Sequence, residues 1–182
     1  RTTSSAASDV YKRQTLFFTM SIFSQKTETH SYKTIFSKNN FEIRNYDPVM
    51  KARTFSKTDN NNFMKLFRYI SGNNQENQKI AMTTPVYMKE DKKGSMMEFV
   101  LPSKFNETNT SKPLSSEVEL YMDDGGIFAT ISYGGYSNPN KRKKYTAELE
   151  EIISKMNLDK IGDFVYLSYD SCLLYTSDAA DE

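Results

Sequence analysis

Histidine, cysteine and tryptophan are almost absent from this 182-residue chain, which has one His, one Cys and no Trp. A clustered Cys/His zinc site and a disulfide framework both need more of these side chains, so both are excluded. Most Cys–His nucleophile arrangements are excluded for the same reason. The sequence also has no GxSxG motif and no recognisable pair of catalytic carboxylates, so we predict a binding protein and not an enzyme.

An excess of charge of one sign is lacking as well. The 24 basic and 23 acidic residues give a formal net charge of +1, which offers little electrostatic attraction for DNA or RNA. No apolar run reaches the ~18 consecutive residues that a membrane-spanning helix needs. We therefore expect one soluble domain, a monomer, with no nucleic acid among its partners.

Aromatic residues and methionine are abundant, with 12 Tyr, 12 Phe and 9 Met. Flat and polarisable side chains of these kinds suit an apolar ligand. They are equally consistent with a core built from Phe and Met in place of Leu, and composition does not choose between the two.

The two ends of the chain differ in character from the part between them. Residues 1–14 and 171–182 are small, polar and aperiodic, and they resemble peptides made when sequencing-library adapters are translated. The apolar stretch Thr15–Phe23 is compatible with two origins: a cytoplasmic protein that starts at Met20, or the stump of a longer signal or anchor segment. The compartment stays open, and membrane contact is expected only in the second case. We divide the chain into an adapter-like or truncated leader segment (1–19), an N-terminal extension (20–40), the folded domain (41–170) and an adapter-like tail (171–182).

The first half of the domain alternates between strand and helix patterns. Apolar and polar residues partly alternate through Phe41–Phe55, which predicts a strand that is bent, bulged or at an edge where Asp47 and Pro48 interrupt it. Residues Asp59–Ser71 have apolar residues at helical spacing and predict a short amphipathic helix. Two apolar runs, Lys79–Glu90 and Ser95–Pro102, then predict a hairpin.

The second half nearly repeats this order. Two alternating runs, Glu117–Met122 and Ile127–Tyr133, flank an Asp-Asp-Gly-Gly sequence and predict a second hairpin. A helix is expected from Pro139 to about Leu158, and a strand over Asp163–Tyr169. The order predicts an α+β domain of two related halves, with helices outside a strongly curved sheet. A second half that mirrored the first would need one more strand after Tyr169.

Six motifs in order carry a resemblance to a known family. They are FEIRNY (41–46), KLFRYISGNN (65–74), KIAMTTPV (79–86), MEFVLP (97–102), ATISYGGY (129–136) and DFVYLSYD (163–170). Together they resemble the SOUL/haem-binding protein family. The resemblance implies a distorted β-barrel of two βαββ-like halves with two flanking helices, here with its last strand missing. It also implies non-covalent binding of haem or related tetrapyrroles in an apolar pocket, as carrier, buffer or scavenger. Two alternatives stay open: a sensor or binder of other hydrophobic small molecules, and an enzyme acting on tetrapyrroles.

The expected first helix contains most of the candidate haem-binding residues. Met64 and Arg68 are four residues apart, so they share a face beside the apolar stripe of Phe63 and Phe67. An arginine can form bidentate bonds with a haem propionate, and the resemblance implies a basic residue in the pocket at Arg68. The alternative is a solvated arginine beside a core stripe. Tyr46 completes the predicted set of cofactor-binding residues.

An axial ligand for haem iron is not evident in the sequence. The resemblance places Asn45 where some family members have a His, and an amide is a poor iron ligand. The single His30 lies in a polar segment and is expected to be exposed. Tyr46, Tyr69 and Met64 are the other possible ligands. We favour binding without an axial residue and predict no metal ligand.

A basic run, Lys141–Lys144, opens the expected second helix. Positive charge opposes the helix dipole there, and three glutamates follow, so we expect a solvated face and not a ligand site.

Overall fold

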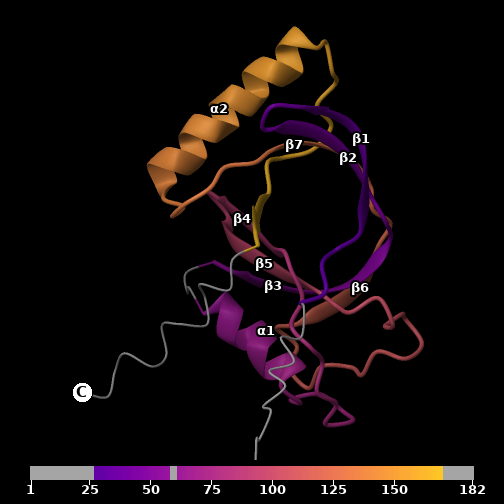
Figure 1. Cartoon of the computed structure of the whole chain (residues 1–182). Helices are drawn as coiled ribbons and strands as arrows, with labels where there is room; N and C mark the ends of the chain where they lie inside the picture. The colour runs from indigo at the N-terminus through magenta and orange to yellow at the C-terminus, as the bar shows by residue number, and fades with distance from the viewer. Residues whose placement is uncertain (1–26, 58–60, 170–182) are drawn as a thin grey trace, which may run out of the picture.

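The computed structural model describes residues 27–57 and 61–169, which form two antiparallel sheets and two helices (Figure 1). The predicted α+β class is confirmed, but the described residues form two sheets and not a closed barrel. The predicted leader (1–19), the tail (171–182) and a further strand after Tyr169 lie outside these residues. The three-stranded sheet has the order β1 (Tyr32–Lys38), β2 (Phe41–Tyr46), β7 (Gly126–Ile131). The five-stranded sheet has the order β6 (Glu119–Asp123), β3 (Val49–Ser56), β5 (Gly94–Val100), β4 (Val86–Asp91), β8 (Tyr166–Ser168).

Two chain segments pass from one sheet to the other with a sharp bend: β2 continues into β3, and β6 continues into β7. β2 pairs with β7 in one sheet, and their continuations β3 and β6 pair in the other. Tyr46 faces Gly126 on one side of the bend and Val49 faces Asp123 on the other, so both chains advance three residues and the register is unbroken. The predicted bend at Asp47 and Pro48 is confirmed, because the chain passes from one sheet to the other there.

The predicted hairpin between the runs at 117–122 and 127–133 is wrong. β6 and β7 do not pair with each other, and their connection is instead the second half of the corner. Gly125 makes this possible, since its φ is +72° and a Cβ on it would lie 2.2 Å from the Tyr46 carbonyl oxygen. The Asp123 carboxylate accepts a 2.8 Å hydrogen bond from the Gly125 N–H and holds the corner from the inside. The Asp-Asp-Gly-Gly sequence, which predicted a hairpin turn, is therefore the place where the chain passes from one sheet to the other.

The first predicted helix is confirmed as α1 (Asn62–Ile70), although residues 59–60 of its predicted start lie outside the described residues. Its contacts are with β3 and β5. The helix buries Leu66 and Ile70 against Met50 and Ala52 of β3, in the main core cluster. This packing places α1 on the outer face of the five-stranded sheet (Figure 1).

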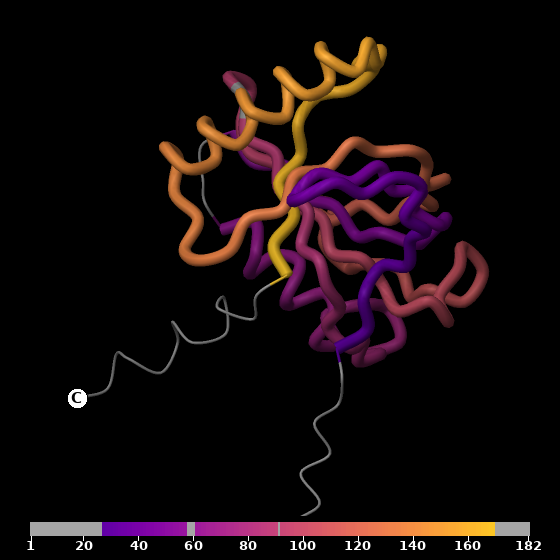
Figure 2. Tube along the Cα trace, turned by 45° about the horizontal axis from the view of Figure 1, so that its top comes forward, coloured from indigo at the N-terminus to yellow at the C-terminus, as the bar shows by residue number. Residues whose placement is uncertain are grey.

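The second predicted helix is confirmed as α2 (Pro139–Lys155). Its N-cap Asn138 accepts a 2.8 Å hydrogen bond from the Lys141 N–H, and Pro139 occupies the first turn, where its missing N–H costs nothing. Leu149 is its buried residue, and the helix packs against β7. Figure 2 shows α2 on the far side of the sheets from α1. Neither described helix is long and apolar enough to cross a membrane.

The remaining strands agree with the sequence in part. The hairpin of β4 and β5 is confirmed, but residues 79–85 of its first predicted run are not strand. β8 covers three of the seven residues predicted as a strand over 163–169. β1 lies within the expected N-terminal extension, where the sequence predicted no strand, and pairs with β2 along its length.

Gly125 gives a test of the corner. We expect Gly125→Ala to lower the free energy of unfolding by about 2 kcal/mol or more, because a Cβ there meets backbone atoms and the positive φ strains an L-residue. Urea unfolding followed by circular dichroism measures the change. Gly134→Ala is the matched control, since a Cβ at that position meets nothing within 4 Å. Equal stabilities of the two variants would contradict the close approach described above.

Candidate functional site

The structure brings four of the five predicted haem-binding residues together on α1. We call Phe63, Met64, Phe67 and Arg68 the α1 surface. The rings of Phe63 and Phe67 stack with their centroids 5.8 Å apart, and Phe63 meets Phe99 edge-on at 5.4 Å. Both phenylalanines are half-buried, whereas Met64 is 42% exposed and Arg68 is exposed. The four-residue spacing therefore produces the predicted shoulder, apolar on one side and cationic on the other.

Three methionines pack against the core cluster that the two phenylalanines also contact. Met82, Met88 and Met97 are half-buried and pack against the same core cluster as Phe63 and Phe67. Met88 and Met97 face each other across β4 and β5. Polarisable, adaptable side chains of the sheet thus contribute to the same partly buried layer as the phenylalanines of α1.

The two basic side chains of α1 differ in their partners. Lys65 is held by the Glu117 carboxylate at 2.8 Å and donates to the Ser56 hydroxyl at 3.0 Å. Arg68 makes no ion pair or side-chain hydrogen bond with any residue that the structure describes. Its guanidinium is therefore the cation of α1 that remains available to an anionic ligand.

Tyr46, the fifth predicted residue, lies elsewhere. Met50 and Ala52 of β3 point toward α1, so Lys51 between them points to the opposite face, over the Tyr87 ring. Tyr46 belongs to that inner face, where its ring lies 4.9 Å from the His30 ring. The five-stranded sheet separates Tyr46 from the α1 surface.

Two other candidate iron ligands are not available at the α1 surface, because Tyr69 already uses its hydroxyl in a hydrogen bond and Asn45 lies on β2. The Tyr69 hydroxyl donates a 2.9 Å hydrogen bond to the Ser111 carbonyl, and burial raises its pKa to about 12. Asn45 is exposed on the outer face of β2. Met64 is the one candidate that lies on the α1 surface.

The inner face between the sheets contains charged residues that sequence reasoning missed. Lys51 lies 2.5 Å from an Asp123 oxygen and 3.6 Å from a Glu98 oxygen, and Glu98 accepts a 2.7 Å bond from the Tyr121 hydroxyl. Burial disfavours ionisation of Asp123, but hydrogen bonds from Lys51 and the Gly125 N–H outweigh it and lower the pKa of Asp123. The sequence of β3 does alternate polar and apolar residues, but this pattern usually indicates that the polar face is exposed to solvent, and so it did not predict a charged cluster between two sheets.

The expectation that His30 is exposed is wrong. The side chain is 5% exposed and hydrogen-bonded at both ring nitrogens. Because the Asp47 carbonyl can only accept, Nε2 donates to it at 2.8 Å, and Nδ1 accepts from the Tyr87 hydroxyl at 2.8 Å. These bonds fit the neutral imidazole. Burial, aided by the nearby Lys51 charge, lowers the pKa of His30 below its ordinary value of 6.5.

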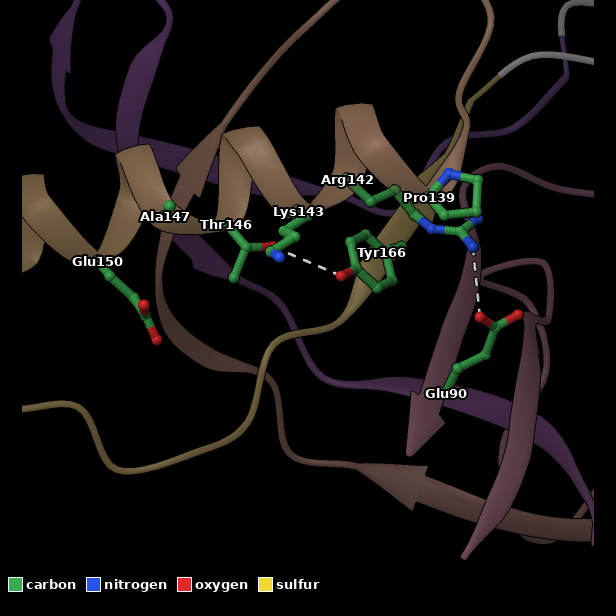
Figure 3. Close-up of a pocket in the computed structure, with 8 residues that line it drawn as sticks. All are labelled: Glu90, Pro139, Arg142, Lys143, Thr146, Ala147, Glu150 and Tyr166. Atoms are coloured by element: carbon green, nitrogen blue, oxygen red, sulfur yellow. Dashed lines mark hydrogen bonds and ion pairs between the residues drawn. The ribbon is translucent and has the colours of Figure 1, made fainter. Parts of the chain in front are cut away.

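The described part of the chain has hollows at two places away from the α1 surface. One, of about 430 Å³, lies between α2 and strands β4 and β8 (Figure 3). The other, of about 350 Å³, lies beside His30 and the corner. The described residues contain no group of three or more His, Cys, Asp or Glu side chains that could hold a metal ion.

His30 makes folding stability depend on pH. The unfolded chain binds a proton near pH 6.5 that the folded chain resists, so stability present above this pH is lost as the pH falls below it. We expect the free energy of unfolding to decrease from about pH 7.5 to about pH 5.5. His30→Gln should be less stable at neutral pH and should lose this dependence, as measured by urea unfolding across the range. An unchanged slope in the variant would show that other groups cause it.

Comparison with known protein families gives one match. Residues 27–177 match the family described as SOUL heme-binding protein. The match begins before the first predicted motif, includes β1, and covers more than half of the chain. No curated protein matches the chain.

Proposed function

The chain belongs to the SOUL heme-binding protein family, and from this premise we propose that it binds haem or a related tetrapyrrole at the α1 surface. Binding is non-covalent, and the protein acts as a carrier, buffer or scavenger. The observation that carries the proposal is the exposed Met64 between a half-buried pair of phenylalanines and an Arg68 without an ion pair among the described residues.

The α1 surface has the side chains that a porphyrin requires. Met64 and Phe67 can cover part of an apolar macrocycle face, and the Arg68 guanidinium can pair with a propionate. Arg68 lies in the last turn of α1, where its charge also interacts favourably with the helix dipole. Haem is the cargo here, and its iron needs no bond to the protein for these contacts to form.

Burial supplies most of the affinity in this proposal. A porphyrin can remove several hundred Å² of apolar area from water, at about 25 cal/mol per Å². Loss of translational and rotational freedom offsets much of this gain, so we expect an affinity near micromolar. An affinity of this size suits reversible carriage or buffering.

We also propose that the protein binds haem without catalysing a reaction on it. Tyr69, a candidate ligand on α1, already uses its hydroxyl, and the titratable residues of the inner face are paired with one another on the other side of the sheet. We therefore propose a binding protein and not an enzyme. Formation of a product when haem is incubated with the protein would overturn the proposal that it is not an enzyme.

A broader binder of flat hydrophobic compounds is the second candidate function. It is favoured by one observation, that the α1 surface has arene and thioether groups and no imidazole. Such a surface binds a ligand through its flat shape and apolar face and not through a metal ion that the ligand contains.

Substitution of Arg68 tests the site. We expect Arg68→Gln to weaken hemin binding roughly threefold to tenfold, because one charge-assisted bond to a propionate is lost at a solvent-accessible position. The measurement is a titration of hemin into the full chain, followed by the shift of the Soret band. Lys144→Gln, an exposed cation on α2, is the matched control and should bind as the unaltered chain does. Equal affinities for all three proteins would remove Arg68 from the site.

Metal-free protoporphyrin IX tests the role of iron. Because the α1 surface contributes apolar contacts and one cation, we expect its dissociation constant to lie within about threefold of that of hemin. Fluorescence quenching during a titration measures it. Hemin binding stronger by two orders of magnitude would show that the protein ligates the iron. Tight binding of planar dyes without carboxylates would favour the second candidate function.

A further inference from the structure

The pocket between α2 and the five-stranded sheet is separate from the α1 surface. Arg142, Thr146 and other residues of α2 form one wall, and Glu90 of β4 and Tyr166 of β8 form the other (Figure 3). Its volume is about 430 Å³, within the lower part of the range for small-molecule sites. We expected the basic run at 141–144 to form a solvated face, but the Arg142 side chain is 24% exposed and lines this pocket.

Arg142 has unused hydrogen-bonding capacity. A guanidinium carries five N–H donors. Among the residues that the structure describes, its side chain makes one hydrogen bond, to Glu90, and this bond is long at 3.3 Å. Glu90 is largely in solvent, with a 63% exposed side chain. An ion pair of this kind is weak, so a ligand anion can take the remaining donors or displace Glu90.

The same pocket offers a flat apolar surface. The Arg142 guanidinium lies 5.2 Å from the centroid of the Tyr166 ring, and Pro139 and Ala147 add apolar area. Within the described ranges, the Tyr166 hydroxyl has one weak hydrogen-bond contact, 3.4 Å from the Thr146 hydroxyl. Figure 3 shows Glu150 at the opposite end from Arg142, so the pocket has a cationic end.

We propose that this pocket is a second ligand site, which takes a small flat aromatic carboxylate. The ring lies against Tyr166, and the carboxylate pairs with Arg142, with the neighbouring Lys143 adding positive charge at the rim. A carboxylate fits better than a cation because the guanidinium of Arg142 is the least exposed charged group among the lining residues, with 24% exposure against 63% for Glu90 and 55% for Glu150. The proposal does not depend on haem binding at the α1 surface.

The probe for the test is 2-naphthoate, titrated into the full chain and followed by its fluorescence. We expect saturable one-to-one binding at millimolar concentration or below. Arg142→Gln should weaken binding at least tenfold, since a bond between two charged groups is lost. Tyr166→Leu should also weaken it, whereas Lys144→Gln, two residues along α2 and not among the lining residues, should bind within twofold of the unaltered chain. Thermal unfolding of each variant checks that it is folded.

The neutral analogue 2-naphthalenemethanol gives a test without substitution. We expect it to bind the unaltered chain at least tenfold more weakly than 2-naphthoate, because it has the same ring without the charge. Equal binding of the two probes, equal binding by folded Arg142→Gln, or no saturation of the unaltered chain would each overturn the proposal.

Competition with hemin separates this site from the α1 surface. We expect saturating 2-naphthoate to leave the hemin affinity unchanged, and Arg142→Gln to bind hemin as the unaltered chain does. Displacement of 2-naphthoate by hemin would show a single shared site and would overturn the second site. Failure of hemin to bind anywhere would leave the result for 2-naphthoate intact.

Discussion

The corner at which β2 becomes β3 and β7 becomes β6 holds the two sheets in position. An unbroken register runs through the bend, so the backbone pairs on either side cannot shift independently of each other. Gly125 allows the two chains to cross with almost no space between them, and the Asp123 carboxylate fixes the turn from within. The three-stranded sheet is thereby folded over the inner face of the five-stranded one.

This arrangement gives the five-stranded sheet two unlike faces. The inner face contains Lys51 with its two carboxylates, and the outer face contains the apolar residues beneath α1. Charges taken out of water are costly unless they are paired, and here Lys51 has both acidic partners and the Tyr87 ring. The charged groups of the inner face are thus paired with one another, and the ligand site that we propose lies on the outer, apolar face.

Helix α2 connects the two sheets at the opposite edge. It packs against β7, and its Arg142 reaches Glu90 and Tyr166 of the other sheet. Because the helix bridges two separate sheets and does not lie flat on one, a hollow remains beneath its first turns. The two proposed sites thus lie at different parts of the five-stranded sheet: α1 packs on the inner strands β3 and β5, whereas the pocket beneath α2 lies near its β4–β8 edge.

The sequence by itself determined the two helices, the β4–β5 hairpin, the family, and the grouping of Met64 and Arg68 beside the phenylalanines. These features depend on spacing within one segment, which a helical or strand period sets directly. Only the tertiary structure decided that Tyr46 lies away from α1, that His30 is buried, and that the Asp-Asp-Gly-Gly sequence is a corner. Each of these depends on which distant strand covers a residue, and a polar residue on a strand has the same local pattern whether it faces water or a second sheet.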